Sequence, residues 1–251
     1  MLLCGCAHGS AGSQQSRRTS SAEPVSSTGS ASAVPIADDR VVVLDPGHNG
    51  GNGAHPEVIG QLVQDGRGRT KPCNTTGTSA SDGYAEHEFN WDVATLVRDA
   101  LIVRGIRVVM TRDDDAGVGP CIDERAAIGN RSGAAAVVSI HADGAAPGAH
   151  GFHVAYSSPP LNPAQGEPSV RLATTLRDTM VGSGFAPSTY VGAEGLNPRG
   201  DLAGLNFSER PVALVECGNM RDPGDAALLE SPDGRAKLAD AIAAAITTYL
   251  G

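Results

Sequence analysis

Four side chains in this sequence have types and positions that suit metal-assisted hydrolysis. Three apolar runs that predict buried strands lead into His48, His141 and Glu216, and Glu86 stands just before a predicted helix. Groups just beyond the carboxyl ends of strands in an α/β sheet converge on one crevice. We therefore expect His48, His141 and Glu216 to lie close together, with Glu86 facing the same crevice.

Two histidines and two glutamates are a donor set that suits zinc. A catalytic zinc takes three protein ligands, for example two His and one Glu, and keeps one position for water. A second carboxylate outside that set can move a proton from the water to a leaving nitrogen. The sequence has no HExxH motif, so it does not predict a zincin helix. These residues predict a metal-dependent hydrolase.

The elements that position these residues alternate between strands and helices. Apolar runs predict strands, and apolar residues at helical spacing predict helices. The expected strands are residues 40–45, 106–110, 135–140, 151–156 and 212–216, and the expected helices are residues 90–104, 123–131, 169–181 and 232–249. The strands are apolar throughout, which is typical of a sheet covered on both faces. We expect an α/β fold with a mixed, mostly parallel, twisted β-sheet flanked by helices on both faces.

Two segments carry no such pattern. Residues 49–85 are rich in Gly, Asn and Thr and have no clear periodicity, and loops of this length are usually functional. Residues 7–36 are rich in serine and nearly free of bulky apolar side chains, which predicts a flexible linker. We therefore divide the chain into residues 1–36, a leader with a linker, and residues 37–251, the catalytic domain.

The first residues resemble the end of a bacterial lipoprotein signal. Leu3-Cys4-Gly5-Cys6 places Cys6 where the lipidated residue would stand. The basic and apolar regions of such a signal are missing here. Either translation starts further upstream or the likeness is accidental. The serine-rich tether that follows favours export, to the periplasm or cell envelope, with membrane attachment where Cys6 is lipidated.

Composition excludes several classes of protein. The net charge of −9 among 251 residues argues against a nucleic-acid-binding protein, which would present a basic face. No run approaches the ~20 apolar residues of a membrane span. Glycine is frequent, at 32 residues, and the charged fraction of 19% is low, which indicates a loop-rich globular protein.

The motifs together, in their order, resemble the zinc N-acetylmuramoyl-L-alanine amidases. The matching segments are Asp45-Pro46-Gly47-His48-Asn49-Gly50, Glu86 with Asn90, Thr111-Arg112, Arg125 with Asn130, Ser139-Ile140-His141-Ala142-Asp143, and Leu214-Val215-Glu216-Cys217-Gly218-Asn219. More narrowly, Pro120-Cys121-Ile122-Asp123-Glu124-Arg125 and Gly151-Phe152-His153-Val154 resemble the mycobacterial single-domain peptidoglycan amidases. The likeness covers roughly residues 40–250.

The resemblance implies a role for each matching residue. His48, Glu86 and His141 match the ligands of one Zn²⁺ per chain, and Glu216 matches the catalytic glutamate. The implied reaction is hydrolysis of the amide between N-acetylmuramic acid and L-alanine in peptidoglycan or its fragments, with Glu216 as proton shuttle. The implied partner is a peptidoglycan or muropeptide substrate, and we expect a monomer.

Cysteines of the related enzymes imply a disulfide between Cys73 and Cys121, which is plausible chemistry in an exported protein. Cys217 departs from the related sequences. If Glu216 points into the crevice, Cys217 points to the opposite face of the strand and acts as a small buried hydrophobe. That placement weakens a reading of Cys217 as a cysteine nucleophile.

Several alternatives stay open at this point. His87 and Glu88 stand beside Glu86 and are also able to ligate a metal. His150 and His153 lie three apart on a strand, so they face opposite sides and make a poor chelating pair.

The basic residues of the long loop fit a solvated loop better than a substrate contact; they are Arg67, Arg69 and Lys71.

Two competing functions stay open. One is a zinc carboxypeptidase acting further along the stem peptide, and the other is a non-catalytic peptidoglycan-binding protein.

Overall fold

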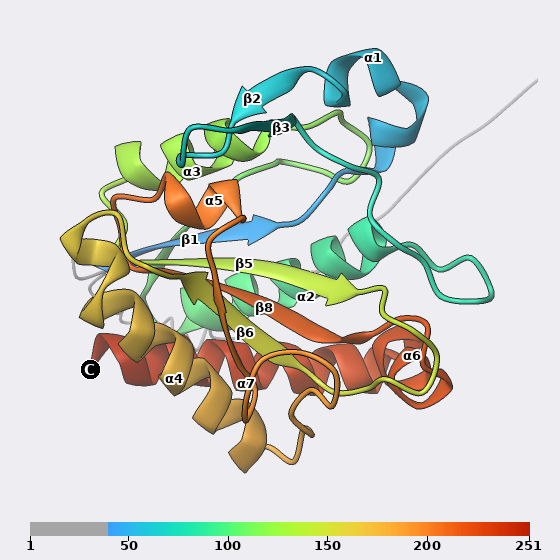
Figure 1. The fold of residues 1–251 in the computed structure, drawn as a ribbon. Coiled ribbons are helices and arrows are strands. Elements are labelled where there is room, and N and C mark those ends of the chain that lie inside the picture. The colour runs from blue at the N-terminus through green and yellow to red at the C-terminus, as the bar shows by residue number, and fades with distance from the viewer. Residues whose placement is uncertain (1–39) are drawn as a thin grey trace, which may run out of the picture. The chain divides into compact units, whose positions relative to one another are not determined.

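The computed structural model describes residues 40–251 (Figure 1). The expected leader with its Cys6, and the serine-rich linker, lie outside the described residues.

A six-stranded sheet forms the centre of the fold, with the strand order β4-β1-β5-β8-β6-β7. Its strands are β1 (Val41–Pro46), β4 (Arg107–Met110), β5 (Ala136–Asp143), β6 (His153–Ser157), β7 (Leu196–Arg199) and β8 (Val212–Asn219). Strands β4, β1, β5 and β8 are parallel neighbours, whereas β6 pairs antiparallel with β8 and parallel with β7. The predicted mixed, mostly parallel sheet is confirmed.

Helices cover both faces of this sheet, as predicted. The longer helices α2 (Glu86–Val103), α4 (Glu167–Gly182) and α7 (Pro232–Leu250) pack on one face. The shorter helices α3 (Ile122–Arg131) and α5 (Ala203–Asn206) lie over the other face (Figure 1). Helix α6 (Pro223–Glu230) links β8 to α7. Helix α7 begins where the sequence predicts, because Ser231 accepts a hydrogen bond from the Gly234 amide and Pro232 occupies the first turn.

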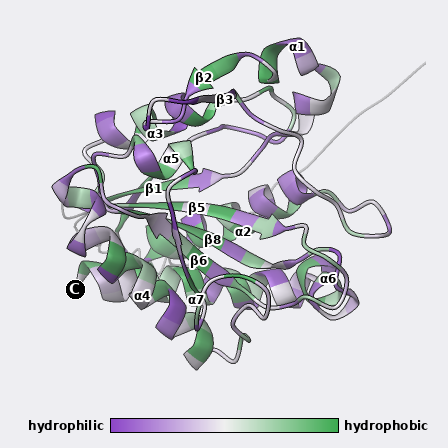
Figure 2. Ribbon diagram, in the orientation of Figure 1, coloured by the Kyte–Doolittle hydropathy of each residue, from purple (hydrophilic) through white to green (hydrophobic). Residues whose placement is uncertain are grey.

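The hydrophobic core is divided unequally between the two faces. The larger cluster lies between the sheet and α2, α4 and α7, and includes Leu44, Phe89, Ile140, Leu176 and Ile242. Figure 2 shows the corresponding hydrophobic colour along the central strands and in α7. The smaller cluster lies beneath α3 and α5. None of the helices in the described part of the chain has the length and apolarity to cross a bilayer.

The segment between β1 and α2 is more ordered than its sequence pattern indicates. It contains helix α1 (Pro56–Ile59) and a hairpin of β2 (Leu62–Gln64) and β3 (Thr70–Pro72). A disulfide joins Cys73 in this segment to Cys121, immediately before α3. Strands of three residues are too short to give a periodic signal, so the sequence showed a loop here.

We expected Arg67, in the turn of this hairpin, to be solvated, but its side chain is hydrogen-bonded to other elements. Its guanidinium donates hydrogen bonds to Asn206 Oδ1 and Ser157 Oγ, each 3.1 Å long. Asn206 in turn donates to the backbone oxygen of Asp65 at 2.8 Å. Arg67 therefore fastens the hairpin to α5 and β6, and this fixes the wall of the cleft described below.

Candidate metal centre

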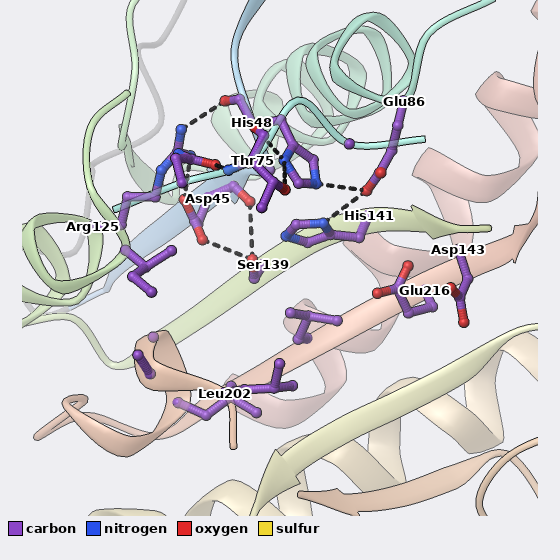
Figure 3. A pocket seen from close by; sticks show the side chains of 18 of the residues that line it. Asp45, His48, Thr75, Glu86, Arg125, Ser139, His141, Asp143, Leu202 and Glu216 are labelled. Atoms are coloured by element: carbon purple, nitrogen blue, oxygen red, sulfur yellow. Dashed lines mark hydrogen bonds and ion pairs between the residues drawn. The ribbon is translucent and has the colours of Figure 1, made fainter. Parts of the chain in front are cut away.

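His48, Glu86 and His141 come together although they belong to three separate elements (Figure 3). His48 follows β1, Glu86 opens α2 and His141 lies near the carboxyl end of β5. Glu86 Oε1 lies 3.1 Å from His48 Nε2 and 2.9 Å from His141 Nδ1. One ligand atom from each residue lies within 4.8 Å of the others.

The three ligand atoms have the chemistry and spacing of a metal site. Bonds of about 2 Å at the tetrahedral angle place neighbouring ligand atoms about 3.3 Å apart, close to the distances seen here. The backbone oxygen of Thr75 lies 3.0 Å from His48 Nδ1 and accepts a hydrogen bond from it. That bond fixes the tautomer in which the lone pair of His48 Nε2 faces Glu86, as at many histidine–metal sites. The residues present therefore fit a metal ion such as zinc.

The backbone around His48 is held by a buried arginine. His48 has a φ of 57°, a left-handed conformation that is uncommon for a residue with a side chain. Arg125 donates to the backbone oxygen of His48 at 2.6 Å and to that of Pro46 at 2.7 Å. Its guanidinium is neutralised by Asp45 at 2.8 Å. This arrangement fixes the direction in which His48 leaves β1.

Glu86 is held at two points by one residue of the preceding loop. The Thr78 amide donates to Glu86 Oε2 at 2.9 Å, and the Glu86 amide donates to the Thr78 oxygen at 3.0 Å. Glu86 is the first residue of α2, four residues earlier than the helix predicted from periodicity. Burial alone would raise the pKa of the Glu86 carboxyl. The proximity of the His48 and His141 imidazoles outweighs burial and holds the pKa of this carboxyl well below its usual range.

The neighbours of Glu86 lie outside this group. His87 Nδ1 lies 2.8 Å from Asp115 Oδ2, and Glu88 is exposed. Of the two more distant histidines, His150 is exposed and His153 is buried. Among residues 40–251, the group that can hold a metal contains none of these four side chains.

Glu216 lies beside the metal-binding group on the adjacent strand. It is the register partner of His141 across the β5–β8 pair. Its Oε2 atom is buried and has no hydrogen-bond partner among the described residues. Burial, and then the negative charges of Glu86 and Asp143, raise the pKa of the Glu216 carboxyl well above its usual range. An unpaired buried carboxyl group is costly, which makes Glu216 a candidate for a chemical role.

A cleft extends from these residues along the sheet. It has a volume of about 450 Å³ and runs over the β5–β8 ladder beneath α3 and α5. Its floor is made of the cross-strand pairs Val137 and Val212, Ser139 and Leu214, and His141 and Glu216. The cleft therefore has an apolar end and a polar end that holds the candidate metal centre.

Cys217 lies on the opposite side of β8, as predicted. Its side chain is 3% exposed and belongs to the larger hydrophobic cluster. Burial raises the pKa of the Cys217 thiol, which keeps it protonated and unreactive. The structure therefore gives no support to a cysteine nucleophile at this position.

Sequence reasoning missed the residues that hold the ligands in place. Thr75 and Thr78 lie in the aperiodic segment, where composition suggested function but no individual residue. Asn52, in the same segment, is fully buried and donates to the Thr75 oxygen at 2.8 Å. The only available signal was the high content of Asn and Thr, side chains that hydrogen-bond to nearby backbone.

Known proteins resemble this chain over most of its length. The family model described as N-acetylmuramoyl-L-alanine amidase, Amidase_3, matches residues 42–248. The N-acetylmuramoyl-L-alanine amidase Rv3717 of Mycobacterium tuberculosis is 46% identical over 229 residues, which cover 91% of this chain and 93% of the relative.

Two solved structures resemble it as well. The N-acetylmuramyl-L-alanine amidase Ami1 of Mycobacterium smegmatis has a TM-score of 0.83 at 54% identity, covering 87% of this chain and 99% of the other. The Mycobacterium abscessus Ami1, solved in its apo form, has a TM-score of 0.82 at 52% identity and covers 84% of this chain and 99% of the other. With the family model spanning nearly the whole described fold, the chain belongs to the Amidase_3 family of N-acetylmuramoyl-L-alanine amidases.

Proposed function

We propose that this protein is an exported, zinc-dependent N-acetylmuramoyl-L-alanine amidase. It hydrolyses the amide between N-acetylmuramic acid and L-alanine in peptidoglycan or its fragments. His48, Glu86 and His141 hold one zinc ion, and Glu216 is the catalytic residue. The observation that carries this proposal is the register pairing of Glu216 with His141, which places an unpartnered carboxylate beside the ligand set.

Each of the three ligand residues contributes differently to metal binding. Glu86 supplies the negative charge, and its second oxygen is satisfied by the Thr78 amide. His48 and His141 supply neutral nitrogen donors, and both nitrogens lie close to Oε1 of that carboxylate. A zinc ion bound by these atoms would act as a Lewis acid on the amide carbonyl and on water.

Glu216 moves the proton that the reaction requires. Hydrolysis of an amide needs a base that deprotonates water and an acid that protonates the leaving nitrogen, and one carboxyl group can do both in turn. Burial and neighbouring negative charge raise the pKa of the Glu216 carboxyl, which makes it a stronger base than a solvated glutamate. The Glu216 side chain lines the cleft beside the ligand residues, and its Oε2 has no protein partner among the described residues.

The reaction is tested by mass spectrometry of fragments released from a muropeptide by the purified, zinc-loaded chain. Amidase activity releases a peptide with a free amine on L-alanine and leaves the intact muramic acid. A carboxypeptidase would instead release amino acids from the other end of the stem peptide. Binding to sacculi without any product would indicate a non-catalytic peptidoglycan-binding protein.

We also propose that residues 37–251 form the catalytic domain and that residues 1–36 serve as leader and tether, with Cys6 as the lipidated residue. The mass of the mature N-terminus isolated from cells tests this division. An unmodified chain that starts at Met1 and stays in the cytosol would contradict it. Light scattering of the purified chain tests the expected monomer.

A further inference from the structure

Arg221 occupies a position between two cavities of the molecule. The larger cavity contains the candidate metal centre, and a second, polar cavity of about 340 Å³ adjoins it. Gly77, Thr78 and Arg221 line both cavities. Arg221 follows β8 by two residues, so it stands at the same edge of the sheet as Glu216.

The backbone at Arg221 is firmly held. Asn219 is completely buried, and its Oδ1 accepts hydrogen bonds from the amides of Arg221 and Ala145, each 3.0 Å long. Its amide nitrogen donates to the backbone oxygens of Ala146 and Ala149, at 3.1 and 2.6 Å. These four bonds tie Arg221 to the loop after β5, so the base of the arginine is fixed in place.

The side chain of Arg221, in contrast, is exposed and has no partner. Its guanidinium makes no hydrogen bond or ion pair with any residue in the described part of the chain. The other two cations of the larger cavity are engaged: Arg125 pairs with Asp45, and Lys71 donates to the Asp201 oxygen at 3.0 Å. Arg221 thus presents a free positive charge on a rigid support beside the site.

We propose that Arg221 binds a carboxylate of the stem peptide and makes the enzyme selective for substrates that carry this charge. The inference rests on the proposed function. The carboxyl group of muramic acid is consumed in the scissile amide, so the glycan arm presents only neutral hydroxyl and acetamide groups near that bond. The peptide arm carries the anions, the first of them on the glutamyl residue after L-alanine.

Distance and charge both fit this assignment. An extended chain of two residues spans about 7 Å, so the glutamyl carboxylate lies within the reach of a long side chain at the edge of the site. Asp143 lines the larger cavity and its negative charge would repel an anionic peptide. A guanidinium offsets this repulsion and offers a two-pronged hydrogen bond to a carboxylate.

The test compares two substrates, N-acetylmuramyl-L-alanyl-D-glutamate and the same molecule with both glutamyl carboxyls amidated. For the wild-type protein we expect kcat/KM to be about tenfold higher for the acid than for the amide, mainly through KM, as for one exposed charge-assisted contact. In Arg221→Gln this ratio falls to about one, and Arg221→Lys recovers part of it. Arg98→Gln, a partly exposed arginine on α2 that lines neither cavity, is the control and keeps the wild-type ratio.

The outcomes separate the two proposals. If Arg221→Gln lowers kcat/KM equally for both substrates, the arginine has a structural role and the inference is wrong. An unchanged ratio in Arg221→Gln would overturn it as well. If the wild-type protein cleaves neither substrate, the proposed amidase function fails, and this inference fails with it.

Discussion

His141 and Glu216 face each other across the parallel strands β5 and β8. Register partners on neighbouring strands project from the same face of a sheet, with their side chains about 5 Å apart. One residue of the pair belongs to the ligand set, and the other carries the unpartnered carboxylate. The register of a single strand pair therefore places the proposed proton carrier beside a proposed metal ligand.

Glu216→Gln should abolish the reaction while leaving the metal in place. The amide keeps the shape of the side chain but cannot accept and return a proton, which costs about two to four orders of magnitude in rate. Glu216 is not among the three residues of the ligand group, so the zinc content of the purified protein should stay at the wild-type value.

The measurement is product formation by mass spectrometry together with elemental analysis of bound zinc. Glu209→Gln, an exposed glutamate just before β8, is the control. Full activity in Glu216→Gln would refute the proposed mechanism, and loss of zinc would show that Glu216 is a ligand.

Glu86→Gln should remove the bound zinc. Glu86 Oε1 contacts both histidines, and its charge is the only negative one in the ligand group. An amide oxygen is a much weaker zinc ligand, so the variant should purify with little zinc and melt at the temperature of the chelator-treated wild type.

Glu88→Gln is the matched control for this change. Glu88 is exposed on the first turn of the same helix, and substitution there should leave zinc content and melting temperature unchanged. A loss of zinc in Glu88→Gln with retention in Glu86→Gln would reverse the assignment of the ligand.

The sheet could be predicted, and so could the strand-end positions of His48, His141 and Glu216, because each depends on local pattern. Runs such as Val41–Leu44 signal a buried strand wherever they occur, and the residue after such a run lies at the edge of the sheet. Helix α2 was predicted too late, since its first turn is polar and its Glu86 side chain turns toward the histidines. Periodicity reports buried apolar faces, whereas Glu86 is buried against the two histidines rather than in the hydrophobic core.

The supports of the site could not be predicted for a different reason. Thr75 and Arg125 act through hydrogen bonds to partners that are distant in the sequence, for instance 77 positions between Arg125 and His48. Arg221 stands in a turn after β8, and only the assembled fold shows that it lines both cavities. Such contacts depend on tertiary structure and leave no periodic trace in the chain.

The stability of the protein should fall as the pH drops from about 4 to about 2, in part because of Asp45. Burial would raise the pKa of this carboxyl, but the Arg125 guanidinium and hydrogen bonds from Thr111, Arg125 and Ser139 outweigh it and lower the pKa to about 2. A carboxyl whose pKa is lower in the folded state stabilises that state fully when the pH is above its unfolded pKa of 3.8. This stabilisation is lost as the pH falls through the folded pKa of about 2. This lowering of the Asp45 pKa corresponds to about 2 kcal/mol in the free energy of unfolding.

Urea unfolding of the wild type and Asp45→Asn between pH 2 and pH 6 measures this effect. The difference in free energy of unfolding between the two proteins should be largest above pH 4 and should shrink by about 2 kcal/mol toward pH 2. A difference that is independent of pH would show that the Asp45–Arg125 pair does not contribute through ionisation.

Reduction of the disulfide should destabilise the fold. The bond closes a loop with a sequence separation of 48 residues, for which chain entropy gives about 4 kcal/mol. The loop includes Thr75 and Thr78, so reduction should also weaken zinc binding. Urea midpoints with and without reductant test this, and in Cys73→Ser/Cys121→Ser the reductant should have no effect. An equal response to reductant in that double variant would assign the effect to something other than this bond.

Gly47→Ala should displace His141 and release zinc, although Gly47 itself offers no ligand. A Cβ atom at this position would lie 2.1 Å from His141 Cε1 and 2.4 Å from its Nε2, closer than atoms can approach. The ring must therefore rotate or the strand end must shift, at a cost of about 1–3 kcal/mol for overpacking. Gly53→Ala is the control, because its Cβ would meet only Thr76 Cγ2, at 3.9 Å. Zinc content and amidase rate of the two variants test the prediction, and full metal binding in Gly47→Ala would show that His141 does not need its present position to hold the ion.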